Sequence, residues 1–223
     1  MKSPTHLVLL SFNGGYVDTL GFLALSGLFT AHVTGNFVTL GATVAVGLGD
    51  ALPKLLALPV FCMIVFTARL FSLRLEDAGI NPIRPLLLIN LTLLCVVAIG
   101  VLYHGPIRPG ENGVTLAVGL MLVAAMAVQN GLHRAYLTKT PPTTLMTGTT
   151  TQILIDVADM VVRTNAESVA VAKMRVGKMV VAVLSFASGC AIGAAGYIFA
   201  PAAAFCVPVI LAAVALLAGV EDN

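Results

Sequence analysis

Charged side chains are scarce in this sequence. Lys, Arg, Asp and Glu make up 10% of the 223 residues, whereas soluble domains carry about 25%. So few charges cannot cover the surface of a soluble domain. Hydrophobic residues instead make up 58% of the chain, and the mean hydropathy is +1.00. The apolar surplus must face lipid, which predicts an integral membrane protein whose first partner is the bilayer.

Further absences exclude several functions. No run of basic residues is long enough to bind nucleic acid. The four cysteines lie in apolar runs without CxxC or metal-ligand spacing, so no metal or other cofactor is expected. Hydrolase elbows, Walker loops, Rossmann fingerprints and HExxH motifs are absent, and the chain is not expected to be an enzyme. No small-x-small cleavage site follows the first apolar run, which is therefore expected to be retained as a span.

Charges and Pro/Gly clusters divide the sequence into eight apolar segments. Six of them have the length to cross about 30 Å of hydrocarbon. Segment 34–48 is too short, and segment 143–162 follows Pro141-Pro142 and carries Asp156 and Asp159, which do not suit a lipid-facing helix. The eight segments are 5–30, 34–48, 53–75, 84–104, 112–137, 143–162, 173–199 and 201–219.

The distribution of Lys and Arg indicates whether the two exceptional segments cross. Eight crossings with an internal N-terminus would place seven of these residues inside and five outside. If segments 34–48 and 143–162 do not cross, ten lie inside and only Lys54 and Arg108 outside, which fits the positive-inside rule far better. The ten internal residues are then Lys2, Arg69, Arg74, Arg84, Arg134, Lys139, Arg163, Lys173, Arg175 and Lys178. We therefore predict an all-α integral membrane protein with about six transmembrane helices plus two short non-crossing or half-helix segments.

A polar pattern occurs twice along the chain. Asp18, near the start of a long apolar run, lies 17 residues before the glycine of Thr34-Gly35-Asn36, which opens the next run. Asn130, beside Gln129 and late in an apolar run, lies 18 residues before the glycine of Thr147-Gly148-Thr149, which opens another. Six crossings give each half an odd number, so the second copy is inverted relative to the first. Residues 1–105 and 106–223 are thus predicted to form two inverted-topology repeats of one membrane domain, with the Thr-Gly ends meeting near the midplane.

Asp18 is the main candidate for a functional residue. An ionised carboxylate at the centre of a membrane helix costs roughly 2.5–3.5 kcal/mol, so it should face a cavity or a partner. One interpretation is a proton or cation site. The alternative is a structural carboxylate that accepts hydrogen bonds from backbone donors near a helix break at Gly14-Gly15.

The two Thr-Gly triplets are typical of helix starts. Thr and Asn cap the first N–H groups, and Gly permits unusual backbone angles. Such helix ends offer N–H donors to an anion or a carbonyl, although an ordinary loop cap has the same sequence. Buried amides more often join helices than bind ligands. The candidate substrate- or ion-binding residues are Asp18, Thr34, Gly35, Asn36, Gln129, Asn130, Thr147, Gly148 and Thr149.

Other polar residues are interpreted as peripheral. Asp156 and Asp159 lie one helical turn apart, and a solvated face near Arg163 is favoured over a cation-attracting mouth. His32 and His133 lie near predicted ends of spans and are expected at the membrane interface.

The run GGYVDTLGFLALSGLFTAHVTGNFVTLG, residues 14–41, resembles the opening signature of the YoaK-like family of bacterial transmembrane proteins. The shared pattern is Gly-x-x-Asp, here ending at Asp18, followed by an aromatic residue and T-G-N. The QN at Gln129 and the T-G-T at Thr147 are similar to the family's second half. The resemblance covers nearly the whole chain. It implies an uncharacterised multi-pass protein of the bacterial inner membrane, and it implies no substrate.

Two functions follow as hypotheses. The first is a small-solute secondary transporter or channel-like permease with a central site at Asp18 and the two Thr-Gly motifs. The alternative is a non-transporting membrane scaffold or partner subunit. A lipid-modifying enzyme is disfavoured, because no nucleophile, base or metal set converges. The Gly-x3-Gly spacing of Gly189 and Gly193 predicts close helix packing, within the chain or in a homodimer.

Overall fold

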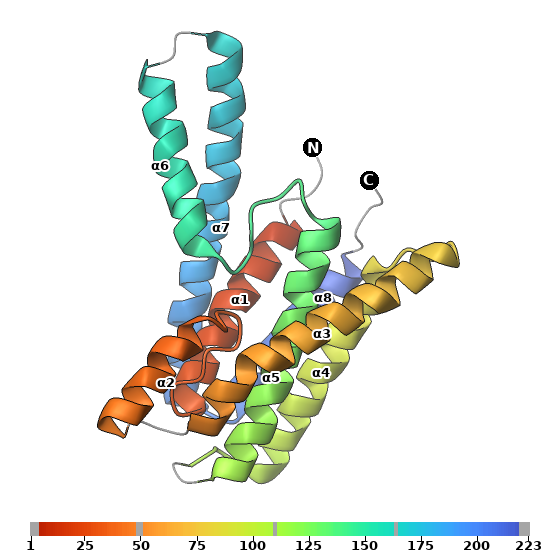
Figure 1. The fold of residues 1–223 in the computed structure, drawn as a ribbon, viewed down its shortest axis with the longest axis vertical. Coiled ribbons are helices and arrows are strands. Elements are labelled where there is room, and N and C mark those ends of the chain that lie inside the picture. Colours follow the sequence, from red (N-terminus) through yellow and green to blue (C-terminus); the bar gives the residue numbers. More distant parts are fainter. Residues whose placement is uncertain (1–4, 48–50, 109–110, 163–164, 219–223) are drawn as a thin grey trace.

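Eight α-helices and one short 3-10 helix are found in the computed structural model, which describes residues 5–47, 51–108, 111–162 and 165–218 (Figure 1). These residues include no β-strand. The elements are α1 (Thr5–Ala24), α2 (Gly35–Val46), α3 (Ala51–Asp77), α4 (Ile83–His104), α5 (Asn112–Tyr136), α6 (Met146–Val162), α7 (Ala166–Phe199), η1 (Ala203–Phe205) and α8 (Cys206–Leu217).

Each predicted apolar segment overlaps one of these α-helices, which confirms the predicted all-α class. Five helices are long and apolar enough to cross a membrane: α1, α3, α4, α5 and the Glu167–Phe199 part of α7. The last predicted span forms only a shorter apolar stretch, Ala203–Leu217, so six crossings stay a prediction. Lys2, Arg163 and the predicted segment ends at Leu48 and Gly219 lie outside the described residues.

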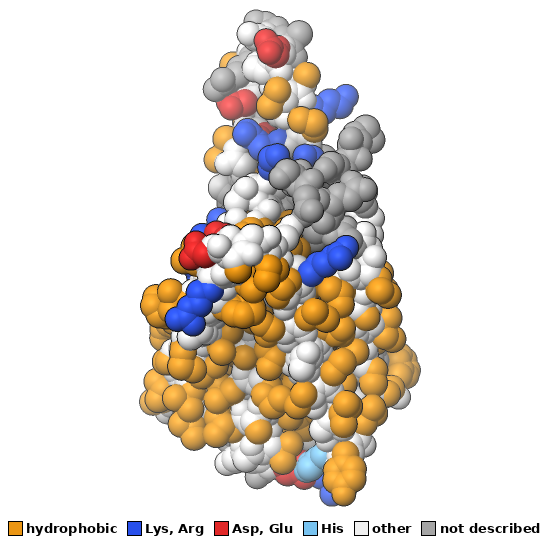
Figure 2. Space-filling model, turned by 90° about the vertical axis from the view of Figure 1, so that its right-hand side faces the viewer, with side chains coloured by type: hydrophobic (Ala, Val, Ile, Leu, Met, Phe, Trp, Pro, Cys, Tyr) orange, Lys and Arg blue, Asp and Glu red, His pale blue; other side chains and the backbone are white. Residues whose placement is uncertain are grey.

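Apolar side chains cover the outside of the helix bundle. In Figure 2 they occupy most of the broad lower body, whereas Lys, Arg, Asp and Glu lie mainly in the narrower upper part and at the lower tip. Large side chains such as Phe66 and Ile99 are exposed on this body. A contiguous apolar surface of this extent indicates contact with lipid.

Helices α1 and α5 form the centre of the bundle. In each of these two helices, 61% of the most apolar 18-residue stretch is buried, whereas in α3 the corresponding share is 11%. The main hydrophobic core includes Tyr16 and Val17 of α1 and Leu122, Val123 and Met126 of α5, all fully buried. Polar residues on the inward faces of α1 and α5 therefore lie where water and lipid are both excluded.

Glycines allow α1 and α7 to meet at backbone contact. A Cβ added to Gly15 would lie 2.1 Å from the Phe186 carbonyl oxygen, and one added to Gly189 would lie 2.1 Å from that of Phe12. A Cβ added to Gly193 would lie 2.8 Å from the Tyr16 carbonyl oxygen. The predicted close packing at Gly189 and Gly193 is thus a seam within the chain. Helix α1 runs unbroken through Gly14-Gly15, so the predicted break there is wrong.

The remaining helices pack around these two. Helix α1 contacts α7 and α8, whereas α5 contacts α3 and α4; α2 lies on α3, and α6 lies on α7. Figure 1 shows α6 and the first half of α7 as a hairpin that extends beyond the bundle. Segment 143–162 was predicted to dip into the membrane and return. Only its first residues enter the bundle, where Thr143 and Thr144 are buried, because α6 itself runs outward along α7.

Candidate functional site

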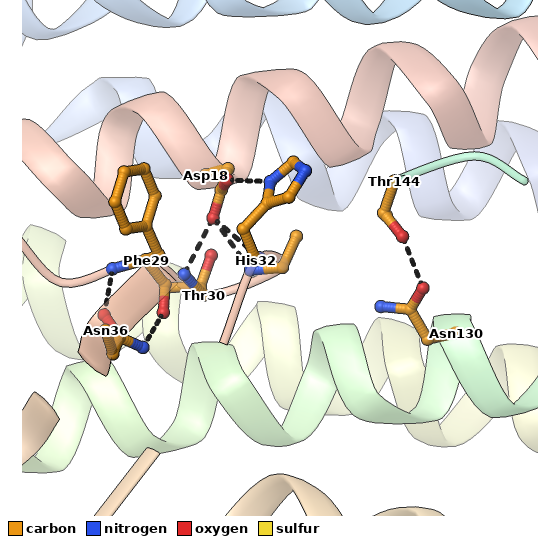
Figure 3. Close-up of polar contacts among 8 residues, drawn as sticks. Asp18, Phe29, Thr30, His32, Asn36, Asn130 and Thr144 are labelled. Atoms are coloured by element: carbon orange, nitrogen blue, oxygen red, sulfur yellow. Dashed lines mark hydrogen bonds and ion pairs between the residues drawn. The ribbon is translucent and has the colours of Figure 1, made fainter. Parts of the chain in front are cut away.

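Asp18 binds the connection between α1 and α2. Its Oδ1 accepts hydrogen bonds from the backbone N–H groups of Thr30 and Ala31, each at 2.8 Å, and a longer one from His32 at 3.4 Å. Its Oδ2 lies 2.6 Å from Nδ1 of the His32 ring (Figure 3). Asp18 is only 4% exposed. These donors replace the water that a buried carboxylate loses, so the side chain is fixed rather than open to solvent.

Asn36 closes the other end of the same connection. Its Oδ1 accepts the N–H of Phe29 and its Nδ2 donates to the Phe29 carbonyl, both at 2.8 Å (Figure 3). The chain reverses after α1 through Ser26 and Gly27, which have positive φ values of 55° and 82°. Residues 25–34, named the first connection here, are thereby held in a non-helical form inside the bundle.

The residues that open α2 act differently from the prediction. Thr34 makes no side-chain capping bond, because its own backbone is helical, so the predicted cap is wrong. Gly35 does not have a positive φ. An added Cβ at Gly35 would lie 3.0 Å from the Phe29 ring, which leaves little room for a larger residue. Gly35 therefore serves close packing rather than an unusual backbone angle.

Asn130 binds the connection between α5 and α6. Its Oδ1 accepts a hydrogen bond from Oγ1 of Thr144 at 2.5 Å, and its Nδ2 donates to the Met126 carbonyl (Figure 3). The carbonyl of Thr143 and the methyl of Thr144 lie 3.1 Å from the position of a Cβ on Gly14. Residues 137–145, the second connection, thus reach α1 as well.

The two connections meet α1 at neighbouring turns. Gly14 contacts the second connection and Asp18 binds the first, and these residues are four positions apart on one face of the helix. Phe186 of α7 approaches both, since its ring lies 5.5 Å edge-on from His32 and 3.7 Å from a Cβ on Gly14. The structure therefore brings Asp18 and Asn130 to one region between α1 and α5.

Gln129 joins the two central helices. Its Oε1 accepts from Nδ2 of Asn13 at 2.9 Å, and its Nε2 donates to the Leu10 carbonyl at 3.0 Å. Gln129 and Asn13 are both 2% exposed. Both ends of the amide are used within the protein, as is usual for an amide that joins membrane helices. Asn13 is absent from the candidates above, although an Asn beside Gly14-Gly15 in an apolar run is a signal for it.

The second Thr-Gly triplet does not join this central site. Thr147, Gly148 and Thr149 form the first turn of α6, which confirms that the triplet opens a helix. Thr149 is buried and donates to the Leu145 carbonyl, whereas Thr147 and Gly148 are exposed. Gly148 and Thr149 line a separate cavity at the base of the α6–α7 hairpin.

His32 belongs to the central site and not to the interface. Its side chain is 31% exposed, and Nε2 makes no hydrogen bond with the residues the structure describes. One ring nitrogen is thus paired with a buried carboxylate while the ring reaches the edge of the packed region. Such a pair can hold and pass a proton. His32 lies 14 residues after Asp18, across a connection whose path the sequence does not define. The pairing of the two side chains therefore could not be predicted from the sequence.

Two further polar residues are buried against expectation. Asp156 is fully buried and accepts two hydrogen bonds from the Arg175 guanidinium and one from Gln152. It joins α6 to α7, so the predicted solvated face is wrong at this position. His133 is 5% exposed, with Nε2 3.0 Å from Oγ1 of Thr140, and is not interfacial either. Within the described ranges no group of His, Cys, Asp and Glu could hold a metal ion.

Comparison with known proteins identifies a family but no activity. A family model described as a protein of unknown function, DUF1275, matches residues 6–218, so the chain belongs to that family. No curated protein and no solved structure matches the chain. The match agrees with the expectation of an uncharacterised family, while the YoaK-like assignment, bacterial origin and inner-membrane location stay predictions.

Proposed function

We propose that this member of the DUF1275 family is a small-solute secondary transporter or channel-like permease of the bacterial inner membrane, coupled to protons through Asp18 and His32. One observation carries the proposal: two non-helical connections are held between the most buried helices, one by Asp18 and the other by Asn130 (Figure 3). Non-helical backbone at membrane depth is tolerated where it is buried in protein or lines a water-filled path. Transporters place their substrate sites at such interruptions.

Helix packing supports the proposal of two inverted repeats, 1–105 and 106–223. Exchanging α1–α4 with α5–α8 turns each contact of α1, with α7 and α8, into a contact of α5, with α3 and α4. The α2–α3 contact likewise becomes the α6–α7 contact. Helices α1 and α5 run in opposite directions in Figure 1, as inversion requires.

The same view supports six crossings. Helices α1, α4 and α7 run downward in Figure 1, and α3, α5 and α8 run upward. Of the described Lys and Arg predicted to be internal, those of α3, α4 and α5 lie toward the upper ends of these helices, Lys139 follows α5, and three lie in the first half of α7. Lys54 and Arg108 lie near the lower ends of α3 and α4. The positive-inside rule then assigns the upper side, with the α6–α7 hairpin, to the cytoplasm.

The proposed mechanism couples a proton to the first connection. Ionised Asp18 holds three N–H groups and the His32 ring, and these bonds fix residues 25–34 between the helices. A proton on the carboxylate weakens its bonds to N–H donors, because charge-assisted hydrogen bonds are about twice as strong as neutral ones. Loosening of the connection would open a path along α1, and solute binding in one of the two states would supply the coupling.

Proton flux into proteoliposomes tests this function. We would screen pools of small solutes for flux of a pH-sensitive dye, comparing wild type with His32→Gln. The control is His104→Gln, a histidine at the lower end of α4 that faces Glu111 at 3.8 Å. We expect a solute-dependent flux that His32→Gln reduces at least tenfold and the control leaves intact. Equal flux in all three proteins would exclude His32 from coupling.

A scaffold or partner subunit is the second candidate, and one observation favours it. Structural residues form their hydrogen bonds within the protein, and so do the side chains of Asp18, Asn36 and Gln129. A scaffold predicts no solute-dependent flux in the screen and effects of mutation only on stability or partner capture. A homodimer is compatible with either function, and cross-linking in native membranes would test it.

A further inference from the structure

A cavity of about 480 Å³ lies at the base of the α6–α7 hairpin, away from Asp18. Its walls come from the end of α5, the second connection, the first turns of α6 and the first half of α7. In Figure 1 the base of this hairpin lies at the upper edge of the bundle, and in Figure 2 the apolar body narrows toward its upper part, where Lys and Arg side chains lie. The cavity therefore lies near the expected membrane surface.

The charge of the cavity is entirely positive. Arg134, Lys139, Arg175 and Lys178 line it, and no acidic residue does. Arg175 is bound to Asp156, which is buried behind the wall. Within the described ranges the other three cations have no ion-pair partner. The cavity thus has an excess positive charge and no counter-charge of its own.

The start of α6 adds neutral donors to this charge. Gly148, in the first turn of this 17-residue helix, lines the cavity, and nothing lies within 4 Å of an added Cβ. The first N–H groups of a helix have no intrahelical acceptor and favour anions. Cationic side chains and a helix N-terminus at one cavity match the oxygen atoms of a phosphate group.

The rest of the wall is apolar. Leu145 of the second connection and Val171 and Met174 of α7 line the cavity while remaining about half exposed to the surroundings. A soluble anion makes no favourable contact with an apolar wall, whereas the glycerol and first acyl carbons of a phospholipid can pack against it. Basic pockets between membrane helices on the cytoplasmic side bind lipid headgroups.

We propose that this cavity binds the phosphate group of an anionic phospholipid in the adjacent leaflet. The phosphate lies against Lys139 and Lys178 and the start of α6, and the apolar part lies toward Leu145 and Met174. A free phosphate ester shares the headgroup chemistry and is the alternative source. The proposal does not depend on transport, because it concerns a site separate from Asp18 and His32.

Calorimetric titration of the full chain in neutral detergent tests the site. The probes are dioctanoyl phosphatidylglycerol, dioctanoyl phosphatidylcholine and inorganic phosphate at constant ionic strength. The variant is Lys139→Gln with Lys178→Gln, which leaves the Arg175–Asp156 pair intact. The control is Lys173→Gln, an exposed cation of α7 that does not line the cavity.

We expect wild type and the control to bind the glycerol lipid at least tenfold more tightly than the choline lipid, and the double variant to lose that preference. If inorganic phosphate binds as tightly as the glycerol lipid, the ligand of the cavity is a soluble phosphate ester and not a lipid. Equal affinity for both lipids in wild type, or an unchanged preference in the double variant, would overturn the proposal. An intact thermal unfolding profile of the double variant separates loss of the site from loss of the fold.

Discussion

Asp18 and Asn130 each bind the residue that lies 14 positions further along the chain. The partner of Asp18 is His32, and that of Asn130 is Thr144. The two helices that carry them, α1 and α5, are the most buried of the candidate spans. The same local arrangement thus occurs once in each half, with an ionisable pair in the first half and a neutral pair in the second. The proposed proton coupling rests on that difference.

Replacing Asp18 with Asn should destabilise the protein through the first connection. The amide retains an acceptor for Thr30 or Ala31 but loses the charge, and hydrogen bonds to charged groups contribute about 1.5–3 kcal/mol. We expect the free energy of unfolding in mixed micelles to fall by about 2 kcal/mol. Glu111→Gln, a more exposed acid just before α5, should change it by less than about 0.5 kcal/mol. Equal effects of the two substitutions would mean that Asp18 does not hold the connection.

Replacing Gly189 with Ala should disrupt the seam between α1 and α7. The new Cβ would lie 2.1 Å from the Phe12 carbonyl oxygen, so the backbones must separate. Overpacking of this kind costs about 1–3 kcal/mol or more. Gly177→Ala on the same helix is the matched control, since its Cβ would meet nothing within 4 Å and Ala favours helix by about 1 kcal/mol. Thermal unfolding should therefore shift downward for Gly189→Ala and slightly upward for Gly177→Ala.

The α6–α7 hairpin should loosen in acid. The hydrogen bond from Arg175 holds the pKa of Asp156 below its ordinary value. A group whose pKa is lowered by folding contributes stability that is complete above its unfolded pKa, about 3.9, and is lost as the pH falls below it. We expect faster hydrogen exchange in residues 146–162 below about pH 4.

The Asp156→Asn variant supplies the control for that measurement. Its hairpin should exchange faster than that of wild type at neutral pH, because the charge is gone. Acid should then produce little further change, once the intrinsic pH dependence of exchange is subtracted. A variant with the same acid response as wild type would show that another group causes it.

Cysteine labelling should separate six crossings from eight. Single cysteines would be introduced into a variant without native cysteines. Ala78→Cys lies between α3 and α4, and Ile107→Cys lies between α4 and α5. Six crossings with the N-terminus inside predict that a membrane-impermeant reagent added from the periplasm labels position 107 alone. Labelling of position 78 from the periplasm, with position 107 protected, would instead support eight crossings.

The sequence predicts the helices well because lipid exposure makes each of them apolar. The sequence misplaces helix ends where the apolar run and the helix do not begin or end at the same residue. Helix α7 begins at Ala166 rather than at residue 173, because its first turns are helical although they carry polar residues such as Glu167 and Ser168. The first segment was predicted to continue to residue 30, whereas α1 ends at Ala24. The first connection is as apolar as a span because residues such as Leu25 and Leu28 are buried in the bundle.

The candidate site was predicted in part. A carboxylate in an apolar run must find partners, and Asp18 does. Its partners are mainly backbone N–H groups, which leave no mark in a sequence, and His32 lies across a connection whose path only the fold defines. The Thr-Gly spacing pointed to both connections, but Asp18 and Asn130 hold them, whereas Thr34 makes no capping bond.

The glycine seam also constrains how the halves can move. Helices α1 and α7 interlock at backbone contact, so they must travel as one rigid body. The corresponding contact of α5 with α3 is looser, because a Cβ on Gly131 would meet Val65 only at 4.0 Å. Any rocking of one half against the other must slide along α3 and α5. If the two halves are the inverted repeats proposed above, the α1–α7 contact is the fixed one and the α3–α5 contact is the one that can slide.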